Sequence, residues 1–165
     1  MNTKYITKIA FTIVVIVGSL YTNSMTNDNN PSLLVHKTPT CGCCKQWIKH
    51  LEKNGFTTST KDHQNLQEIK ESYQIRPEYR SCHTGVSKDG YIFEGHIPSE
   101  YITQFLSEEH PNAIGLSVPG MPLGSPGMEV EGRFMQYDVL ILFKDGTSKI
   151  YAKVSHSTLH VLIQI

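Results

Sequence analysis

The first third of the chain alternates between strand-like and helix-like patterns of hydrophobic positions. The apolar run 33–36 predicts a short buried strand, which Thr38-Pro39-Thr40 ends. Apolar residues then recur with the period of an amphipathic helix, at Cys44, Trp47, Ile48 and Leu51. We expect this helix to end at Asn54-Gly55, because glycine is favoured just after a helix. Residues 56–60 are rich in Thr and Phe and predict a second strand.

The middle of the chain continues this order with a helix, a hairpin and another helix. Asn65 and Glu68 form a capping pair for a helix expected to bury Leu66, Ile69 and Tyr73. Asp89-Gly90 lies between two strand-like runs and predicts a β-hairpin. A further helix is expected to be capped by Ser99 and to bury three apolar residues, Ile102, Phe105 and Leu106.

The order of these elements predicts the fold class. A βαβ unit followed by ββα is the order of the thioredoxin fold, in which helices cover a four-stranded mixed sheet. Residues 118–128 are too rich in Pro and Gly for a regular helix or a central strand. Asp145-Gly146 separates strand-like runs 137–143 and 150–154. We therefore predict an α/β protein with a thioredoxin-like βαβ-ββα core, an added Met/Pro/Gly-rich loop and a C-terminal β-hairpin.

The ends of the chain differ in composition from this core. Lys4 and Lys8 precede an apolar run too short to span a bilayer, so we expect residues 1–24 to be a signal peptide or an N-terminal anchor. Export to the periplasm follows from the signal peptide. We expect a flexible leader over 25–31, the metal-binding domain over 32–155, and a tail of unassigned structure over 156–165. Contact with a membrane is expected only through an uncleaved N-terminus or this apolar tail.

Charge and cysteine content narrow the function classes. The 165 residues carry 15 basic and 15 acidic side chains, so the chain lacks the basic excess of a nucleic-acid-binding protein. Hydrophobic residues make up 39% of the chain, which fits a globular protein. Three of the four cysteines lie within four residues, which an ordinary structural disulfide does not explain.

The cysteine cluster Cys41-Gly42-Cys43-Cys44 is the main chemical signal. It lies between a predicted strand and a helix N-terminus, where exposed N–H groups and the helix dipole stabilise thiolates. Cys41 and Cys44 have the spacing of a redox-active dithiol. Cys43 adds a third soft ligand, which favours a site for Cu(I) or Zn(II) over a plain disulfide switch. Three buried structural cysteines are the alternative interpretation.

Further candidate ligands come from three other segments. Cys82 and His83 begin the third predicted strand, and both can face the site only if the backbone there is irregular. His96 is a third candidate, although the histidines could equally be hydrogen-bonded or solvated. Met121 and Met128 lie in the Pro/Gly-rich loop, where core packing is hard to achieve, and thioethers bind Cu(I) well. The methionines favour copper over zinc.

Five ordered motifs give the chain a resemblance to a known family. They are Thr40-Cys41-Gly42-Cys43-Cys44, Ser81-Cys82-His83-Thr84, Glu94-Gly95-His96-Ile97-Pro98, the segment 115–122 and the segment 124–129. Over about 33–154 the chain closely resembles the CopG-like family, the domain of unknown function 411. The resemblance implies an exported, thioredoxin-like copper-resistance protein that binds a cysteine-bridged copper cluster and interconverts Cu(I) and Cu(II). By motif, it implies the copper ligands Cys41, Cys43, Cys44, Cys82, Met121 and Met128, with His83 and His96 as candidates.

These observations predict an exported protein that holds Cu(I) in a cysteine-rich site, with one or several copper ions. The expected partners are metal ions and other copper-handling proteins. Copper oxidoreductase activity is left open. The alternatives are a thiol–disulfide oxidoreductase that uses Cys41 and Cys44, and a metallochaperone that delivers copper to a partner.

Overall fold

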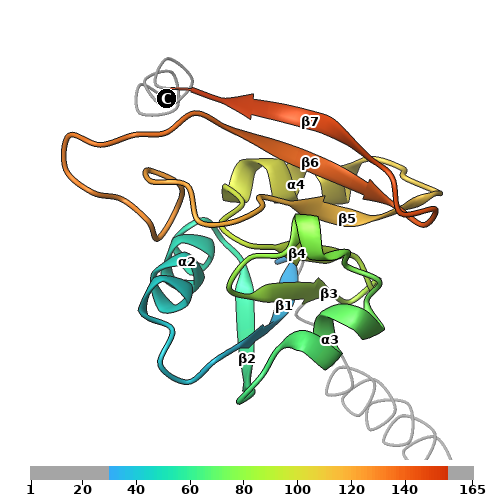
Figure 1. Ribbon diagram of the computed structural model, residues 1–165, viewed down its shortest axis with the longest axis horizontal. Helices are drawn as coiled ribbons and strands as arrows, with labels where there is room; N and C mark the ends of the chain where they lie inside the picture. The colour runs from blue at the N-terminus through green and yellow to red at the C-terminus, as the bar shows by residue number, and fades with distance from the viewer. Residues whose placement is uncertain (1–29, 156–165) are drawn as a thin grey trace, which may run out of the picture.

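A computed structural model describes residues 30–155 of the chain (Figure 1). The predicted signal peptide, most of the predicted leader and the tail lie outside the described residues. The elements follow one another as β1 (Ser32–Lys37), α2 (Gly42–Lys53), β2 (Thr57–Asp62), α3 (Gln67–Ser72), the 3₁₀ turn η1 (Pro77–Tyr79), β3 (Thr84–Ser87), β4 (Ile92–Glu94), α4 (Ser99–Ser107), β5 (Ala113–Ser117), β6 (Tyr137–Phe143) and β7 (Ser148–Val154). None of the described helices is long and apolar enough to cross a membrane.

The predicted α/β class and the predicted order of elements are confirmed. The described strands form one sheet in the order β2-β1-β3-β4-β5-β6-β7. β1 runs parallel to β2 and antiparallel to β3, and β4 returns antiparallel to β3. The first four strands therefore form the mixed sheet expected of the βαβ-ββα unit. α2 and α3 lie on opposite faces of it (Figure 1).

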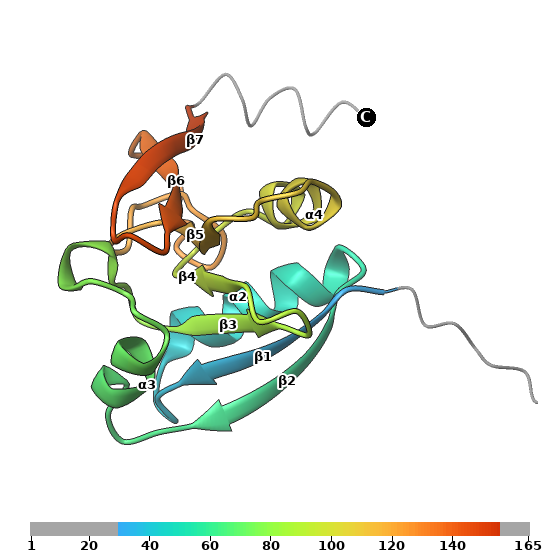
Figure 2. The ribbon, with the colours of Figure 1, turned by 90° about the vertical axis from the view of Figure 1, so that its right-hand side faces the viewer.

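The added C-terminal hairpin continues this sheet. β5 pairs parallel with β4, and the predicted hairpin β6–β7 pairs antiparallel with β5 (Figure 2). The sequence pattern did not predict β5, because this five-residue strand contains Gly115. The glycine is explained by packing: a Cβ atom there would lie 1.8 Å from the Ile92 carbonyl oxygen. The close approach lets β5 pair with β4 and places the Pro/Gly-rich loop beside the cysteine cluster.

The hydrophobic core fixes α2 against the sheet. Trp47 and Leu51 of α2 are fully buried, and they share one cluster with Ile102 and Phe105 of α4. The Trp47 indole Nε1–H donates to the carbonyl oxygen of Ile97 at 2.8 Å. This bond and the packing hold the N-terminal turn of α2 in place relative to the segment that follows β4.

Two local predictions were wrong. Ser99 does not cap α4; instead its backbone N–H donates to Nε2 of His50 at 3.0 Å, so a side chain of α2 satisfies this helix end. At α3, Leu66 is buried as predicted, but Ile69 and Tyr73 are only partly buried and the buried residue of the helix itself is Lys70. A buried lysine is rare unless it is paired, and Lys70 forms an ion pair with the buried carboxylate of Glu94.

Candidate metal centre

The N-terminus of α2 places three cysteine side chains on one turn. Cys41 is the N-cap residue, and its sulfur accepts a hydrogen bond from the backbone N–H of Cys44 at 3.3 Å. Cys43 and Cys44 belong to the first turn, where the helix dipole favours negative charge. Cys44 is fully buried, whereas Cys41 and Cys43 are partly exposed. The turn therefore gathers three sulfurs at a helix N-terminus and leaves the side chains of Cys41 and Cys43 partly accessible.

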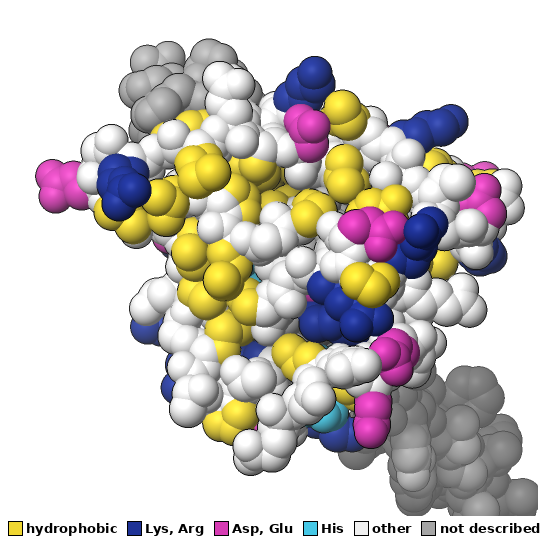
Figure 3. All heavy atoms as spheres, in the orientation of Figure 1, with side chains coloured by type: hydrophobic (Ala, Val, Ile, Leu, Met, Phe, Trp, Pro, Cys, Tyr) yellow, Lys and Arg dark blue, Asp and Glu magenta, His cyan; other side chains and the backbone are white. Residues whose placement is uncertain are grey.

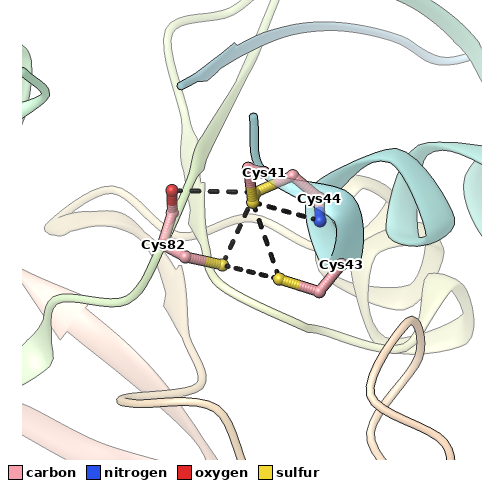
Figure 4. Close-up of side chains that lie close together, drawn as sticks. All are labelled: Cys41, Cys43, Cys44 and Cys82. Atoms are coloured by element: carbon pink, nitrogen blue, oxygen red, sulfur yellow. Dashed lines mark hydrogen bonds between the residues drawn. A yellow bond between two sulfur atoms is a disulfide. The ribbon is translucent and has the colours of Figure 1, made fainter. Parts of the chain in front are cut away.

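Cys82 brings a fourth sulfur to the cluster from the segment just before β3 (Figure 4). Its Sγ lies 3.6 Å from Sγ of Cys44 and 3.8 Å from Sγ of Cys43. Cys41 and Cys43 have their sulfurs 3.5 Å apart. All four sulfurs lie within 4.8 Å of one another, so the four side chains could share metal ions.

Cys41 and Cys44 are joined by a disulfide, while Cys43 and Cys82 are free. A disulfide sulfur carries no thiolate charge and is a poor metal ligand. The two-electron reduction of this bond, with two protons, restores four thiols in one place. The cluster can therefore change its number of thiolate ligands with its redox state.

Two imidazoles extend the cluster on the far side of Cys82. Sγ of Cys82 lies 3.2 Å from Nδ1 of His83 and 3.1 Å from Nε2 of His96. Nδ1 of His96 also lies 2.8 Å from the carbonyl oxygen of Pro126. A carbonyl can only accept, so Nδ1 of His96 carries the proton and the lone pair on Nε2 faces Cys82. His96 is thus oriented as metal-ligating histidines usually are.

The backbone around Cys82 and His83 is irregular, as the sequence required for both side chains to reach one point. β3 begins only at Thr84, so neither residue belongs to a regular strand. Nε2 of the fully buried His83 has no hydrogen-bond partner among the described residues. Its other ring nitrogen, Nδ1, faces the sulfur. Cys82, His83 and His96 form a second group of possible ligands that shares Cys82 with the four cysteines.

The Pro/Gly-rich loop is held near the cysteine cluster beside each of its two methionines. Near Met121, the Gly120 N–H donates to the Arg80 carbonyl at 3.2 Å, beside the segment that holds Cys82. Near Met128, the backbone of Gly127 packs against Cys43 and Trp47 at the start of α2. Apolar side chains gather over this loop on the face shown in Figure 3. Met121 is 52% exposed and Met128 is partly buried. Methionine ligation stays a prediction.

Burial sets the protonation of the inner candidate ligands. Desolvation and the neighbouring Cys43 raise the pKa of the Cys82 thiol to about 12. A metal ion that binds this sulfur must therefore displace a proton. Desolvation also lowers the pKa of His83 well below its usual value and lowers that of His96, which keeps both imidazoles neutral. Neutral imidazole is the form that binds metals.

These lowered pKa values predict how the stability of the metal-free protein depends on pH. Below about 6.5 the unfolded chain binds protons that buried His83 and His96 do not, so the unfolding free energy falls as pH falls. Each such histidine contributes a slope of up to about 1.4 kcal/mol per pH unit. Denaturant titrations from pH 8 to pH 5 should show a shallower fall for His83→Gln. At pH 8 the difference in unfolding free energy between His83→Gln and the wild type reports the effect of the substitution on packing alone. An unchanged slope in His83→Gln would contradict the assignment of His83 as a buried, neutral imidazole.

The described residues form a mixed α/β domain that carries a thiol- and imidazole-rich candidate metal centre at a helix N-terminus. The family model described as "Protein of unknown function, DUF411" matches residues 79–128. Two solved structures described as copper resistance protein CopG, forms 2 and 1, are each 39% identical to the chain. Form 2 has a TM-score of 0.72 and the alignment covers 76% of this chain and 99% of that chain; form 1 gives 0.70, 74% and 96%.

The chain belongs to the CopG-like DUF411 family. A comparison with curated protein sequences found no match.

Proposed function

We propose that this protein is an exported copper-binding protein of copper resistance, which holds Cu(I) in the cysteine-rich centre. One observation carries the proposal: the sulfur of Cys82 lies within 3.8 Å of sulfurs on α2 and within 3.2 Å of two imidazole nitrogens. The description of the related structures as copper resistance proteins supports the choice of metal. Periplasmic location follows from the expected signal peptide.

The donor set fits Cu(I). Soft thiolates and thioethers select Cu(I), and a zinc site of four protein ligands would not need methionine. In this proposal Cys41, Cys43, Cys44 and Cys82 bind as thiolates after the disulfide is reduced. His96 binds through Nε2 and His83 through Nδ1. Met121 and Met128 complete the ligand set from the loop.

The shared position of Cys82 favours more than one copper ion per chain. A thiolate sulfur has several lone pairs and can bridge two soft cations. Two ligand groups that meet at one sulfur therefore suit a cluster better than a single tetrahedral ion. Bridging thiolates also offset the repulsion between neighbouring cations. Interconversion of Cu(I) and Cu(II) would use the same ligands.

A thiol–disulfide oxidoreductase is the second candidate function. The Cys41–Cys44 disulfide favours it, as does the hydrogen bond from the helix N-terminus to the partly exposed Cys41 sulfur. Such an enzyme exchanges its disulfide for two thiols of a substrate and needs neither Cys43 nor the methionines. A metallochaperone role would use the copper centre as proposed here and add a partner.

Replacing Cys43 with serine separates the two functions. The copper proposal expects Cys43→Ser to lose Cu(I) ions measured by chelator competition under reducing conditions. The oxidoreductase alternative expects the variant to keep wild-type turnover of a dithiol substrate. Ser87→Ala, a buried position outside the site, serves as the control for both assays. Full Cu(I) loading together with undiminished dithiol turnover in Cys43→Ser would overturn the copper proposal.

A further inference from the structure

A buried ion pair lies directly behind the candidate metal centre. The carboxylate of Glu94, at the end of β4, is fully buried and pairs through Oε1 with the Lys70 ammonium group from α3. Oε1 also accepts the backbone N–H of Ser81 at 2.6 Å, and Oε2 accepts the Thr84 hydroxyl at 2.6 Å. Nζ of Lys70 donates to the Thr84 hydroxyl oxygen at 3.1 Å.

The contacts of Glu94 flank Cys82 and His83 on both sides. Ser81 precedes the two ligand candidates and Thr84 follows them. Consecutive residues of a regular strand point to opposite faces, yet Sγ of Cys82 and Nδ1 of His83 lie 3.2 Å apart. The Glu94 carboxylate accepts hydrogen bonds from both ends of this irregular segment. These bonds constrain its backbone so that both side chains can reach the same point.

Glu94 also connects this segment to the one that bears His96. His96 follows two residues after Glu94, and the N–H of the intervening Gly95 donates to the His83 carbonyl oxygen at 3.0 Å. His83 and His96 therefore approach the Cys82 sulfur from two segments of the chain, and Glu94 joins these two segments. The three cysteines of α2 are held separately, by the helix and by packing of Trp47.

We propose that Glu94, neutralised by Lys70, is a positioning residue that sets the Cys82, His83 and His96 half of the metal centre. This inference rests on the proposed copper function. Loss of the Glu94 carboxylate should disturb the half of the site that contains imidazole nitrogen and leave the cysteines at the start of α2 in place. The hydrogen bonds of the two charged groups go to Ser81, to Thr84 and to each other, and the Lys70 charge also acts on His83.

Two double variants test the role of the acceptor without an unpaired buried charge. Single substitutions would leave one charge buried alone, which destabilises the whole fold, whereas apolar replacement of a buried pair is often tolerated. Lys70→Met with Glu94→Gln removes both charges but keeps an amide oxygen for the Ser81 N–H. Lys70→Met with Glu94→Met removes the acceptor as well. Circular dichroism reports whether each variant folds.

The expected results differ between the two variants. Lys70→Met/Glu94→Met should lower the Cu(I) affinity about 10–100-fold, the usual effect of losing an outer partner of a metal ligand. It should also lose nitrogen scattering from the X-ray absorption spectrum of the copper-loaded protein. Lys70→Met/Glu94→Gln should keep the nitrogen signal and an affinity near that of the wild type. Thr84→Val, which keeps both charges, releases one side of the segment and should give a smaller loss.

Wild-type affinity and nitrogen scattering in Lys70→Met/Glu94→Met would overturn the inference. If Lys70→Met/Glu94→Met does not fold, wild-type Cu(I) affinity and nitrogen scattering in Thr84→Val would overturn the inference instead. Equal losses in both double variants would also overturn it, because the charges rather than the acceptor would then be responsible. A wild-type protein that binds no Cu(I) would contradict the proposed function itself, so the two failures are distinguishable.

Discussion

Cys82→Ser should reduce Cu(I) binding more than any other single side-chain substitution in the chain. Cys82 is the one sulfur that both groups of candidate ligands share. A serine hydroxyl is a hard, protonated donor that cannot bridge Cu(I) ions. The Cu(I) affinity, measured by chelator competition under reducing conditions, should fall by more than the roughly 10–100-fold that loss of an outer partner costs. The number of bound copper ions should fall as well.

The control for this variant is Ser87→Ala, a change of similar size at a buried position in β3. It should keep full Cu(I) binding. The unfolding free energy of metal-free, reduced Cys82→Ser should fall by no more than about 1–3 kcal/mol, because the hydroxyl is smaller than the thiol but can still hydrogen-bond to the neighbouring imidazoles. Wild-type copper loading by Cys82→Ser would remove the basis for a shared, bridging sulfur.

Gly127→Ala should detach the Pro/Gly-rich loop from the start of α2. Gly127 has φ +86°, and a Cβ atom there would lie 2.7 Å from the Cys43 carbonyl oxygen and 2.8 Å from the Trp47 nitrogen. Both contacts are backbone atoms of a packed helix, so the loop must move. Movement would carry away Met128 and the Pro126 carbonyl that orients His96. We expect lower Cu(I) affinity and a lower unfolding free energy.

Gly120→Ala is the matched control in the same loop. Gly120 also has a positive φ, +68°, but nothing lies within 4 Å of a Cβ atom at this position. It should therefore show only the conformational cost of about 1–2 kcal/mol in unfolding free energy. Its Cu(I) affinity should remain close to that of the wild type. Equal copper affinities in the two alanine variants would show that the seating of the loop on α2 does not matter for binding.

Helices and strands with a strong hydrophobic periodicity were predictable from the sequence. Elements that depend on contacts with distant parts of the chain were not. The helical spacing of Cys44, Trp47 and Leu51 identified α2, and its N-terminus located the cysteine cluster. β5 was missed because Gly115 weakens its strand pattern, and the need for glycine depends on the distant Ile92 backbone. A local hydrophobic pattern indicates which face of a helix or strand is buried, but not which distant backbone that helix or strand approaches.

The same distinction applies to the candidate site. The four cysteines were predictable because clustered soft ligands have few structural explanations. The orientation of His96 was not, because the Pro126 carbonyl that sets it lies 30 residues away. Glu94 belongs to one of the sequence motifs, but its burial and its pairing with Lys70 were not predictable, since a charged residue is expected at the surface and only the fold shows that these two are buried together.

The number of Cu(I) ions bound per chain separates a copper cluster from a single-ion site and from an enzyme that binds no metal. Protein without its first 24 residues would be fully reduced, loaded with Cu(I) without oxygen and separated from free metal before copper and protein are quantified. We expect more than one Cu(I) ion per chain, with sulfur-dominated coordination in the X-ray absorption spectrum. Binding of no copper, or of a single zinc ion that Cu(I) cannot displace, would contradict it.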